Sequence, residues 1–336
     1  MKLIRLMFAI TAAMSLALIA CSGSKTSAAA TTDNTAAATD EPGQFSADSA
    51  MAYASRQVEF GPRVPGTAAH AACRDWLVNT LRTAGADSVA ILRSQATAWD
   101  GTHLDVQNIF ATFNAAAPTG ILVLAHYDTR PWADSETDPT LRDTPIDGAN
   151  DGASGVAVIL EIARNLGLRP ADVRVDLLLT DCEDYGVRSD APASGDEDSW
   201  AIGARRFAEH LPYSSAMPAP RFGILLDMVG GRGARFNREY FSVTEAQKPT
   251  AKIWAMADRM GLADRFPMAV GGAITDDHLP LIRAGIPTAD IIESANPATG
   301  SFPATWHTHE DNLSNLDPAT MLAVGRVVLN VIYHEK

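Results

Sequence analysis

The stretch Ile121-Leu122-Val123-Leu124-Ala125 is an uncharged apolar run, and His126-Tyr127-Asp128 follows it directly. A short apolar run of this kind, bounded by polar residues, is typical of a buried strand. A second run, over 173–179, leads in the same way into Thr180-Asp181-Cys182-Glu183-Asp184. In open α/β sheets, ligands bind at the edge formed by the carboxyl ends of the strands. These two stretches therefore indicate an α/β fold with a polar site at that edge.

Strands and helices are predicted to alternate along the chain. Short apolar runs predict strands over 106–113, 121–125, 173–179, 222–226 and 286–292, and helical spacing predicts helices over 67–84, 155–168, 200–210, 248–260 and 318–333. This alternation predicts a three-layer α/β/α sandwich with a mixed, mostly parallel central sheet. The ranges 106–113 and 121–125 lie too close for a helical crossover, so part of the sheet is expected to be antiparallel.

The first residues are expected to be a targeting signal. Lys2 and Arg5 precede an uncharged apolar run over 6–20, which is too short for a comfortable membrane span and is typical of a signal peptide. The run ends in Leu18-Ile19-Ala20-Cys21, which resembles the bacterial lipoprotein cleavage box. We therefore expect 1–20 to be a lipoprotein signal peptide and Cys21 to carry a lipid; an ordinary secretory signal is the alternative. Ser22, which is not Asp, favours an exported, membrane-anchored lipoprotein on the periplasmic side of the outer membrane.

Composition limits the remaining organisation and the partners. Residues 21–44 are mostly small and polar, which predicts a flexible tether, and 45–336 is long enough for a single large α/β domain. The formal charge of −13 becomes −15 when Lys2 and Arg5 are removed with the signal, which argues against a nucleic acid partner. Cys73 and Cys182 could form a disulfide in an exported protein. Their predicted positions, in a helix and beside the site, favour two free thiols.

Several segments carry side chains that bind metals or move protons, and each has a plainer alternative. His126 and Asp128 are either a ligand pair or an oriented histidine. Asp151, among glycines, lies close to a ligand or caps the helix at 155–168. Glu183 and Asp184 are costly at a buried strand end unless a dication compensates them; otherwise they lie on an exposed turn.

The later segments extend the same set of donors. Asp227 is an isolated acid after a strand, and Asp276-Asp277-His278 precede a predicted helix that either Asp could cap. Trp306, in a long loop directly before His307, either packs or walls a substrate pocket. Imidazole and carboxylate donors from separate segments suit Zn²⁺. The residues therefore predict a zinc enzyme.

Taken in order, these segments resemble the zinc-dependent aminopeptidase superfamily, and more closely the animal-type glutaminyl cyclases and their bacterial relatives. The resemblance spans 45–336 and implies an aminopeptidase-like fold and an acyltransferase that converts N-terminal glutamine of peptides or proteins to pyroglutamate, releasing ammonia. It implies one Zn²⁺ on Asp151, Asp184 and His307, with Glu183 as proton shuttle. It further implies an acidic network of Asp227 and Asp276 and a substrate pocket lined by Trp306, Phe302 and Trp200.

Two other functions stay open. In a two-zinc aminopeptidase, His126 and Asp227 would bind a second Zn²⁺ and Asp151 would bridge the two ions. A non-catalytic, surface-binding lipoprotein on the same fold is the other, although no proposed ligand or base is missing. Asp276 and Trp306 favour the cyclase branch, for which one zinc per chain is expected, against two for an aminopeptidase.

Overall fold

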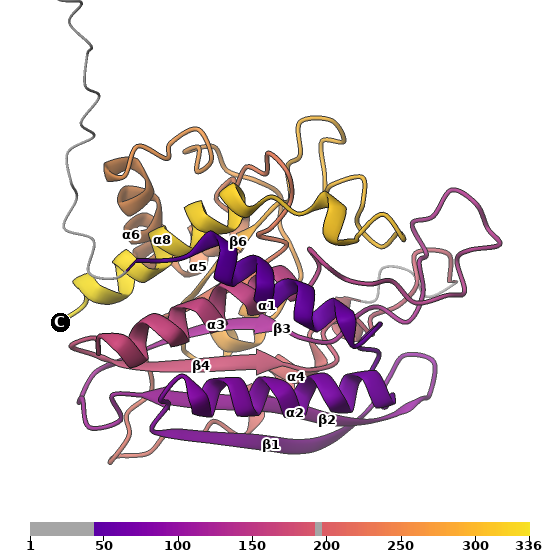
Figure 1. Ribbon diagram of the computed structural model, residues 1–336. Helices are drawn as coiled ribbons and strands as arrows, with labels where there is room; N and C mark the ends of the chain where they lie inside the picture. The colour runs from indigo at the N-terminus through magenta and orange to yellow at the C-terminus, as the bar shows by residue number, and fades with distance from the viewer. Residues whose placement is uncertain (1–43, 192–196) are drawn as a thin grey trace, which may run out of the picture. The chain divides into compact units, whose positions relative to one another are not determined.

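The computed structural model describes residues 44–191 and 197–336 (Figure 1). The predicted signal peptide, the lipid attachment site at Cys21 and nearly all of the predicted tether lie outside these described residues. The described residues all belong to one compact unit. None of the helices within these two ranges combines the length and the apolar character needed to cross a membrane.

A six-stranded sheet forms the middle layer, with its strands in the order β1-β2-β4-β3-β5-β6. The strands are β1 (Ser88–Thr97), β2 (His103–Phe113), β3 (Gly120–His126), β4 (Arg174–Thr180), β5 (Gly223–Asp227) and β6 (Thr288–Ile292). β4, β3, β5 and β6 are parallel neighbours, whereas β2 is antiparallel to both β1 and β4. The predicted mixed, mostly parallel sheet is thus confirmed.

Antiparallel pairing was expected between the strands predicted at 106–113 and 121–125, which correspond to β2 and β3. These two strands are not neighbours in the sheet. β2 and β3 are separated by β4, which pairs with β2 in the register Ile109 opposite Leu179. β1 was not predicted at all. It is an edge strand in which exposed and half-buried residues alternate, so it lacks the continuous apolar run that marks a buried strand.

Helices cover both faces of the sheet (Figure 1). One face carries α1 (Ala47–Glu59), α2 (Ala68–Thr83), α3 (Ala153–Leu168), α6 (Gln247–Arg259) and α8 (Pro318–His334), which share one hydrophobic core. The other carries α4 (Ile202–Glu209) and α7 (His278–Arg283), whose Phe207 and Leu281 pack on the sheet; α5 (Tyr240–Glu245) lies beside β6. The three-layer sandwich is confirmed. α1 escaped prediction because it buries the small residues Ala50 and Ala54 rather than a stripe of large apolar ones.

Close packing of α3 against β5 positions the site. A Cβ atom placed on Gly155 would lie 2.2 Å from the carbonyl oxygen of Leu226, so only glycine lets the first turn of α3 approach the end of β5 this closely. Asp151 immediately precedes α3 and Asp227 ends β5. The contact therefore brings these two carboxylates to the same edge of the sheet.

Candidate metal centre and active-site pocket

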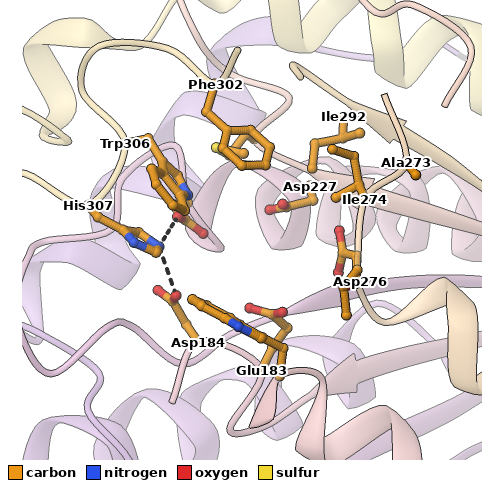
Figure 2. Close-up of a pocket in the computed structure, with 14 residues that line it drawn as sticks. Glu183, Asp184, Asp227, Ala273, Ile274, Asp276, Ile292, Phe302, Trp306 and His307 are labelled. Carbon is orange, nitrogen blue, oxygen red and sulfur yellow. Dashed lines mark ion pairs between the residues drawn. The ribbon is translucent and has the colours of Figure 1, made fainter. Parts of the chain in front are cut away.

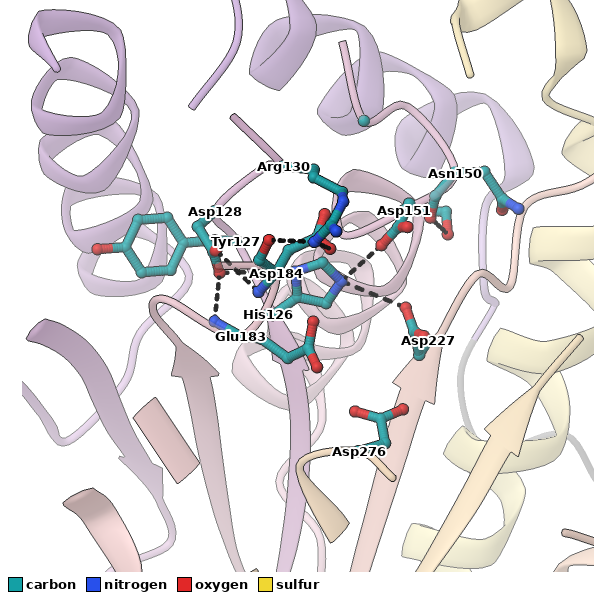
Figure 3. A network of polar contacts seen from close by, with 12 residues as sticks. His126, Tyr127, Asp128, Arg130, Asn150, Asp151, Glu183, Asp184, Asp227 and Asp276 are labelled. Carbon is teal, nitrogen blue, oxygen red and sulfur yellow. Dashed lines mark hydrogen bonds and ion pairs between the residues drawn. The ribbon is translucent and has the colours of Figure 1, made fainter. Parts of the chain in front are cut away.

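The carboxyl edge of the parallel strands brings together Asp151, Asp184 and His307, the three predicted zinc ligands. Figure 2 shows His307 beside Asp184, and Figure 3 shows Asp184 near Asp151. His307 Nε2 lies 3.1 Å from Asp184 Oδ1 and 3.6 Å from Asp151 Oδ2. All three side chains are buried, and one donor atom from each lies within 4.8 Å of the others. Residues far apart in the sequence thus form one compact set of donors.

This donor set fits a zinc ion. Tetrahedral ligands at about 2.0–2.1 Å from Zn²⁺ are roughly 3.3 Å from one another, and the two measured spacings, 3.1 and 3.6 Å, lie on either side of that value. Asp184 Oδ2 is buried and has no hydrogen-bond partner in the described part of the chain. Burial, with the nearby charge of Asp151, raises the pKa of Asp184 to about 6. A dication would compensate both the missing partner and the unfavourable charge.

Two further carboxylates hold these ligands in place. Asp128 accepts hydrogen bonds of 3.1 Å from the backbone N–H groups of both Glu183 and Asp184. Asp311 accepts 2.7 and 3.0 Å hydrogen bonds from the N–H groups of Asn150 and Asp151. Asp128 is therefore an orienting group. The capping alternative for Asp151 is wrong, because the N-cap of α3 is Gly152.

Backbone strain gathers around the same site. Cys182, Met228 and His307 have φ angles of 57°, 48° and 55°, in the left-handed region that residues with a Cβ rarely adopt. Each is a predicted site residue or lies next to one. Such strain is held by the surrounding structure and is common where side chains must be aimed at a ligand.

A second group of donors shares Asp151. His126 Nε2 lies 2.9 Å from Asp151 Oδ1 and 3.3 Å from Asp227 Oδ1, while its Nδ1 lies 3.6 Å from Asp128. Burial alone would lower the pKa of His126, but its carboxylate neighbours outweigh burial and raise the pKa well above its usual range. These residues can either hold a second cation or form an ion pair around a protonated imidazole. The predicted second-site candidates thus lie together.

The carboxyl groups of Glu183, Asp227 and Asp276 face one space beside the candidate metal ligands (Figure 3). Burial and the charge of Asp276 raise the pKa of Glu183 well above its usual range, and burial and the charge of Asp227 do the same for Asp276. Glu183 is buried, so the exposed-turn alternative is wrong. Asp277 is the N-cap residue of α7, but its side chain makes no capping hydrogen bond. Its carboxyl group accepts a hydrogen bond from the Thr180 hydroxyl instead. Because their pKa values are raised, Glu183 and Asp276 can take up and release protons at a higher pH than ordinary carboxyl groups.

A cavity of about 270 Å³ opens onto these groups (Figure 2). The Trp306 ring stacks on His307 with 3.6 Å between ring centres, and Phe302 packs on Trp306 at 4.7 Å. Trp200 lies parallel to His307 at 5.9 Å. Trp306 therefore lines the pocket instead of packing elsewhere. The cavity wall contains the predicted residues together with others that the sequence did not suggest, which are Met228, Ala273, Ile274, Thr275 and Ile292.

Several buried polar residues near the site were missed from the sequence. Arg130 and Asp134 lie in a loop behind His307, and Asp290 forms a third donor group with Asp276 and His278. Asp290 could have been noticed, because it is an acid inside the otherwise apolar run over 286–292. Arg130 and Asp134 carry no such signal, since they stand outside any periodic segment.

The cysteines are as expected. Cys73 and Cys182 are both free and buried. Burial raises the pKa of the Cys73 thiol to about 11, and burial together with the charge of Asp181 raises that of Cys182 further from its usual range. Neither thiol belongs to a donor group, so both are packing residues.

Comparisons with known proteins agree with this geometry. The pattern of Peptidase family M28 matches residues 108–332. Bacteroides thetaiotaomicron glutaminyl cyclase, solved with N-acetylhistamine, is 43% identical with a TM-score of 0.84, over 87% of this chain and 99% of that one. A leucine aminopeptidase precursor from the same species is 42% identical with a TM-score of 0.83, over 87% and 98%.

A curated animal relative extends the similarity. The glutaminyl-peptide cyclotransferase-like protein of Bos taurus is 27% identical over 287 residues, which cover 79% of this chain and 70% of that protein. The family match takes in every residue of the candidate metal centre and of the facing carboxyl groups. The chain therefore belongs to peptidase family M28.

Proposed function

We propose that this protein is a glutaminyl-peptide cyclotransferase, which converts N-terminal glutamine of peptides or proteins to pyroglutamate and releases ammonia. The observation that carries the proposal is the position of Asp276. Its buried carboxyl group faces Glu183 and Asp227 across the cavity, yet it belongs to neither donor group that contains Asp151. Its charge, with burial, raises the pKa of Glu183, the group that would move a proton from the amine to the departing ammonia. The similarity to solved bacterial glutaminyl cyclases supports the same reading.

The chemistry follows from the residues in place. A zinc ion held by Asp151, Asp184 and His307 would supply Lewis acidity toward the γ-amide oxygen of the substrate. The nitrogen of the substrate's α-amine forms a bond to the carbonyl carbon of the γ-amide, and Glu183 accepts a proton from that amine. Glu183 then returns that proton to the amide nitrogen, the bond between carbon and that nitrogen breaks, and ammonia leaves. The raised pKa of Glu183 suits both halves of this transfer.

The pocket walls decide which nucleophile reacts. Trp306, Phe302 and Ile292 present apolar surface to the cavity. A glutaminyl side chain inserted among them displaces water from the neighbourhood of its carbonyl carbon. The substrate's own amine, held next to that carbon, is then the nearest nucleophile, and cyclisation is favoured over hydrolysis.

A two-zinc aminopeptidase is a second candidate, because the His126, Asp151 and Asp227 group offers donors for another ion. One solved relative is a leucine aminopeptidase precursor. A non-catalytic protein is disfavoured, since every proposed ligand and the proposed base meet in one pocket.

The deciding experiment compares two substrates with the same purified, zinc-loaded protein. A glutaminyl peptide is followed for ammonia release and the matching loss of mass, and a leucyl chromogenic amide is followed for cleavage. Cyclisation without leucyl cleavage, with one zinc per chain by elemental analysis, supports the proposal. Leucyl cleavage without cyclisation, with two zinc ions per chain, would establish the aminopeptidase instead.

We also propose that the protein is exported as a lipoprotein anchored through Cys21, with its catalytic domain on the periplasmic side, in the outer membrane. The cleavage-box sequence and Ser22 support this. Metabolic labelling with palmitate tests it: the wild-type chain should take up label into the membrane fraction, and Cys21→Ala should not. Label on the Cys21→Ala variant would contradict the proposal.

A further inference from the structure

A buried carboxylate lies behind the metal-facing histidine. His307 presents Nε2 to Asp184 and Asp151, while its other ring nitrogen, Nδ1, faces Asp134 Oδ1 at 3.5 Å. The Asp134 side chain is 1% exposed. Nδ1 is itself buried and has no hydrogen-bond partner among the described residues. Asp134 Oδ1 lies within ion-pair distance of it, slightly too far for a hydrogen bond. Asp134 is thus placed at the back of the imidazole, on the side opposite the proposed ion.

Arg130 holds Asp134 in this position. Arg130 Nε and Nη2 donate to the two Asp134 oxygens at 2.6 and 2.7 Å, a paired arrangement that fixes the carboxylate in its plane. The guanidinium also donates to the carbonyl oxygens of Asp184, Gly186 and Val187 at 3.1, 3.3 and 3.2 Å. One buried arginine therefore connects the carboxylate behind His307 with the backbone that carries Asp184.

The loop that bears Asp134 is also joined to the segment that bears His307. The N–H of Ser135 donates to the His307 carbonyl at 3.2 Å, and the N–H of His309 donates to Glu136 Oε1 at 2.9 Å. These contacts flank the Asp134–His307 pair on the same two segments. They fix the distance between the carboxylate and the ring while His307 keeps its left-handed backbone.

We propose that Asp134, held by Arg130, is the positioning residue that orients His307 for metal binding. By accepting a hydrogen bond from Nδ1–H, for which the 3.5 Å contact need only shorten slightly, the carboxylate selects the tautomer whose lone pair is on Nε2, directed at Asp151 and Asp184. Its negative charge also makes the ring a stronger donor. The inference rests on the proposed metal centre and adds to it a residue that binds neither ion nor substrate.

The test measures zinc affinity rather than turnover. The dissociation constant of Zn²⁺ is determined by competition with a chelator of known affinity for the wild-type protein, Asp134→Asn and Glu136→Gln. The last is a matched control, because glutamine keeps an Oε1 that can accept from the His309 N–H and so preserves the contact between the two segments. It removes only the charge beside His309 Nδ1, at 3.0 Å, and neither residue belongs to a donor group. We expect Asp134→Asn to weaken zinc binding by roughly 10–100-fold and Glu136→Gln to leave it unchanged. The visible spectrum of the cobalt-loaded Asp134→Asn protein should change as well.

A purely structural role for the Arg130–Asp134 pair predicts a different result. In that case Asp134→Asn would lower the melting temperature of the metal-free protein but leave the zinc dissociation constant at its wild-type value. That result would overturn the proposal. Should Asp134→Asn not fold, Arg130→Lys carries the test, because lysine keeps the charge but cannot hold the carboxylate with two parallel bonds. Wild-type zinc affinity in that variant would equally overturn it. If the wild-type protein binds no zinc, the proposed metal centre is refuted. If the wild type and the variant bind zinc equally well, only the role of Asp134 is refuted.

Discussion

Replacing Glu183 by glutamine should slow turnover by orders of magnitude while leaving the proposed zinc site intact. The substitution keeps the size of the side chain and removes its ability to take a proton. The backbone N–H groups at 183 and 184 would still be held by Asp128, at 3.1 Å each, so Asp184 should keep its place. The neighbouring Asp184→Asn provides the opposite pattern, because it removes a donor and should release zinc.

The size of the effect follows from what a positioned acid–base group contributes. Proton transfer by such a group is worth roughly 10²–10⁴ in rate, or about 3–5 kcal/mol of transition-state stabilisation. Burial and the charge of Asp276 hold the pKa of Glu183 well above its usual range, so the lost group is a stronger base than an ordinary carboxylate. We therefore expect kcat to fall by roughly 10²–10⁴ with KM nearly unchanged.

The assay is ammonia release from a glutaminyl peptide under saturating conditions, with the zinc content of each sample measured in parallel. Glu183→Gln should contain as much zinc as the wild type, and Asp184→Asn should contain less. A Glu183→Gln protein that keeps a near-native kcat would refute the assignment of the proton transfer to this residue. Loss of zinc from Glu183→Gln would show instead that the two neighbouring acids do not have separate roles.

Three other substitutions or treatments test the packing described above. Gly155→Ala should lower the unfolding free energy by about 1–3 kcal/mol, because its Cβ would lie 2.2 Å from a backbone carbonyl oxygen at the end of β5; Gly272→Ala, which meets nothing within 4 Å, should be neutral in the same denaturant titration. Trp306→Ala should lower kcat/KM for glutaminyl peptides at least several-fold, because it removes a pocket wall and a stacked ring pair worth about 0.5–1.5 kcal/mol; an unchanged value would place the substrate elsewhere. Cys73 and Cys182 should resist iodoacetamide at pH 8 in the native protein and react after denaturation, because burial raises the pKa of Cys73 to about 11 and that of Cys182 well above its usual range; rapid native labelling, read by mass spectrometry, would contradict their burial.

Much of the fold could be predicted because its central strands are buried on both faces. β3 and β4 are buried along their whole length. The β3 sequence is an almost unbroken apolar run, whereas β4 is apolar over Leu177-Leu178-Leu179 and carries the buried Arg174 and Asp176 before that. The edge strand β1 alternates, and α1 packs through alanines, so neither produced a pattern strong enough to recognise. The order of strands also had to come from the structure, because nothing in the sequence near 113–120 shows that β4 will insert between β2 and β3.

Predictability of the site residues also depended on whether they lie near a regular element. Asp151, Asp184 and Asp227 could be chosen because each lies next to a regular element, whose direction determines where its end points. Asp134 could not be chosen in this way. It lies beside His307 only because of the paths of two long irregular loops, which the sequence does not reveal. His307 also lies in a loop, but the family resemblance supplied it. Loop residues that no resemblance points to, such as the groups that support the ligands, require coordinates.

The two oxygens of the Asp151 carboxylate face different donor groups, Oδ1 beside His126 and Oδ2 beside His307. A protein engineer therefore cannot remove one donor group through Asp151 without damaging the other. Asp227, which contacts only the His126 side, is the position at which the two can be separated. Conversion between a one-ion cyclase and a two-ion hydrolase on this scaffold should thus begin at the end of β5, leaving the loop before α3 untouched.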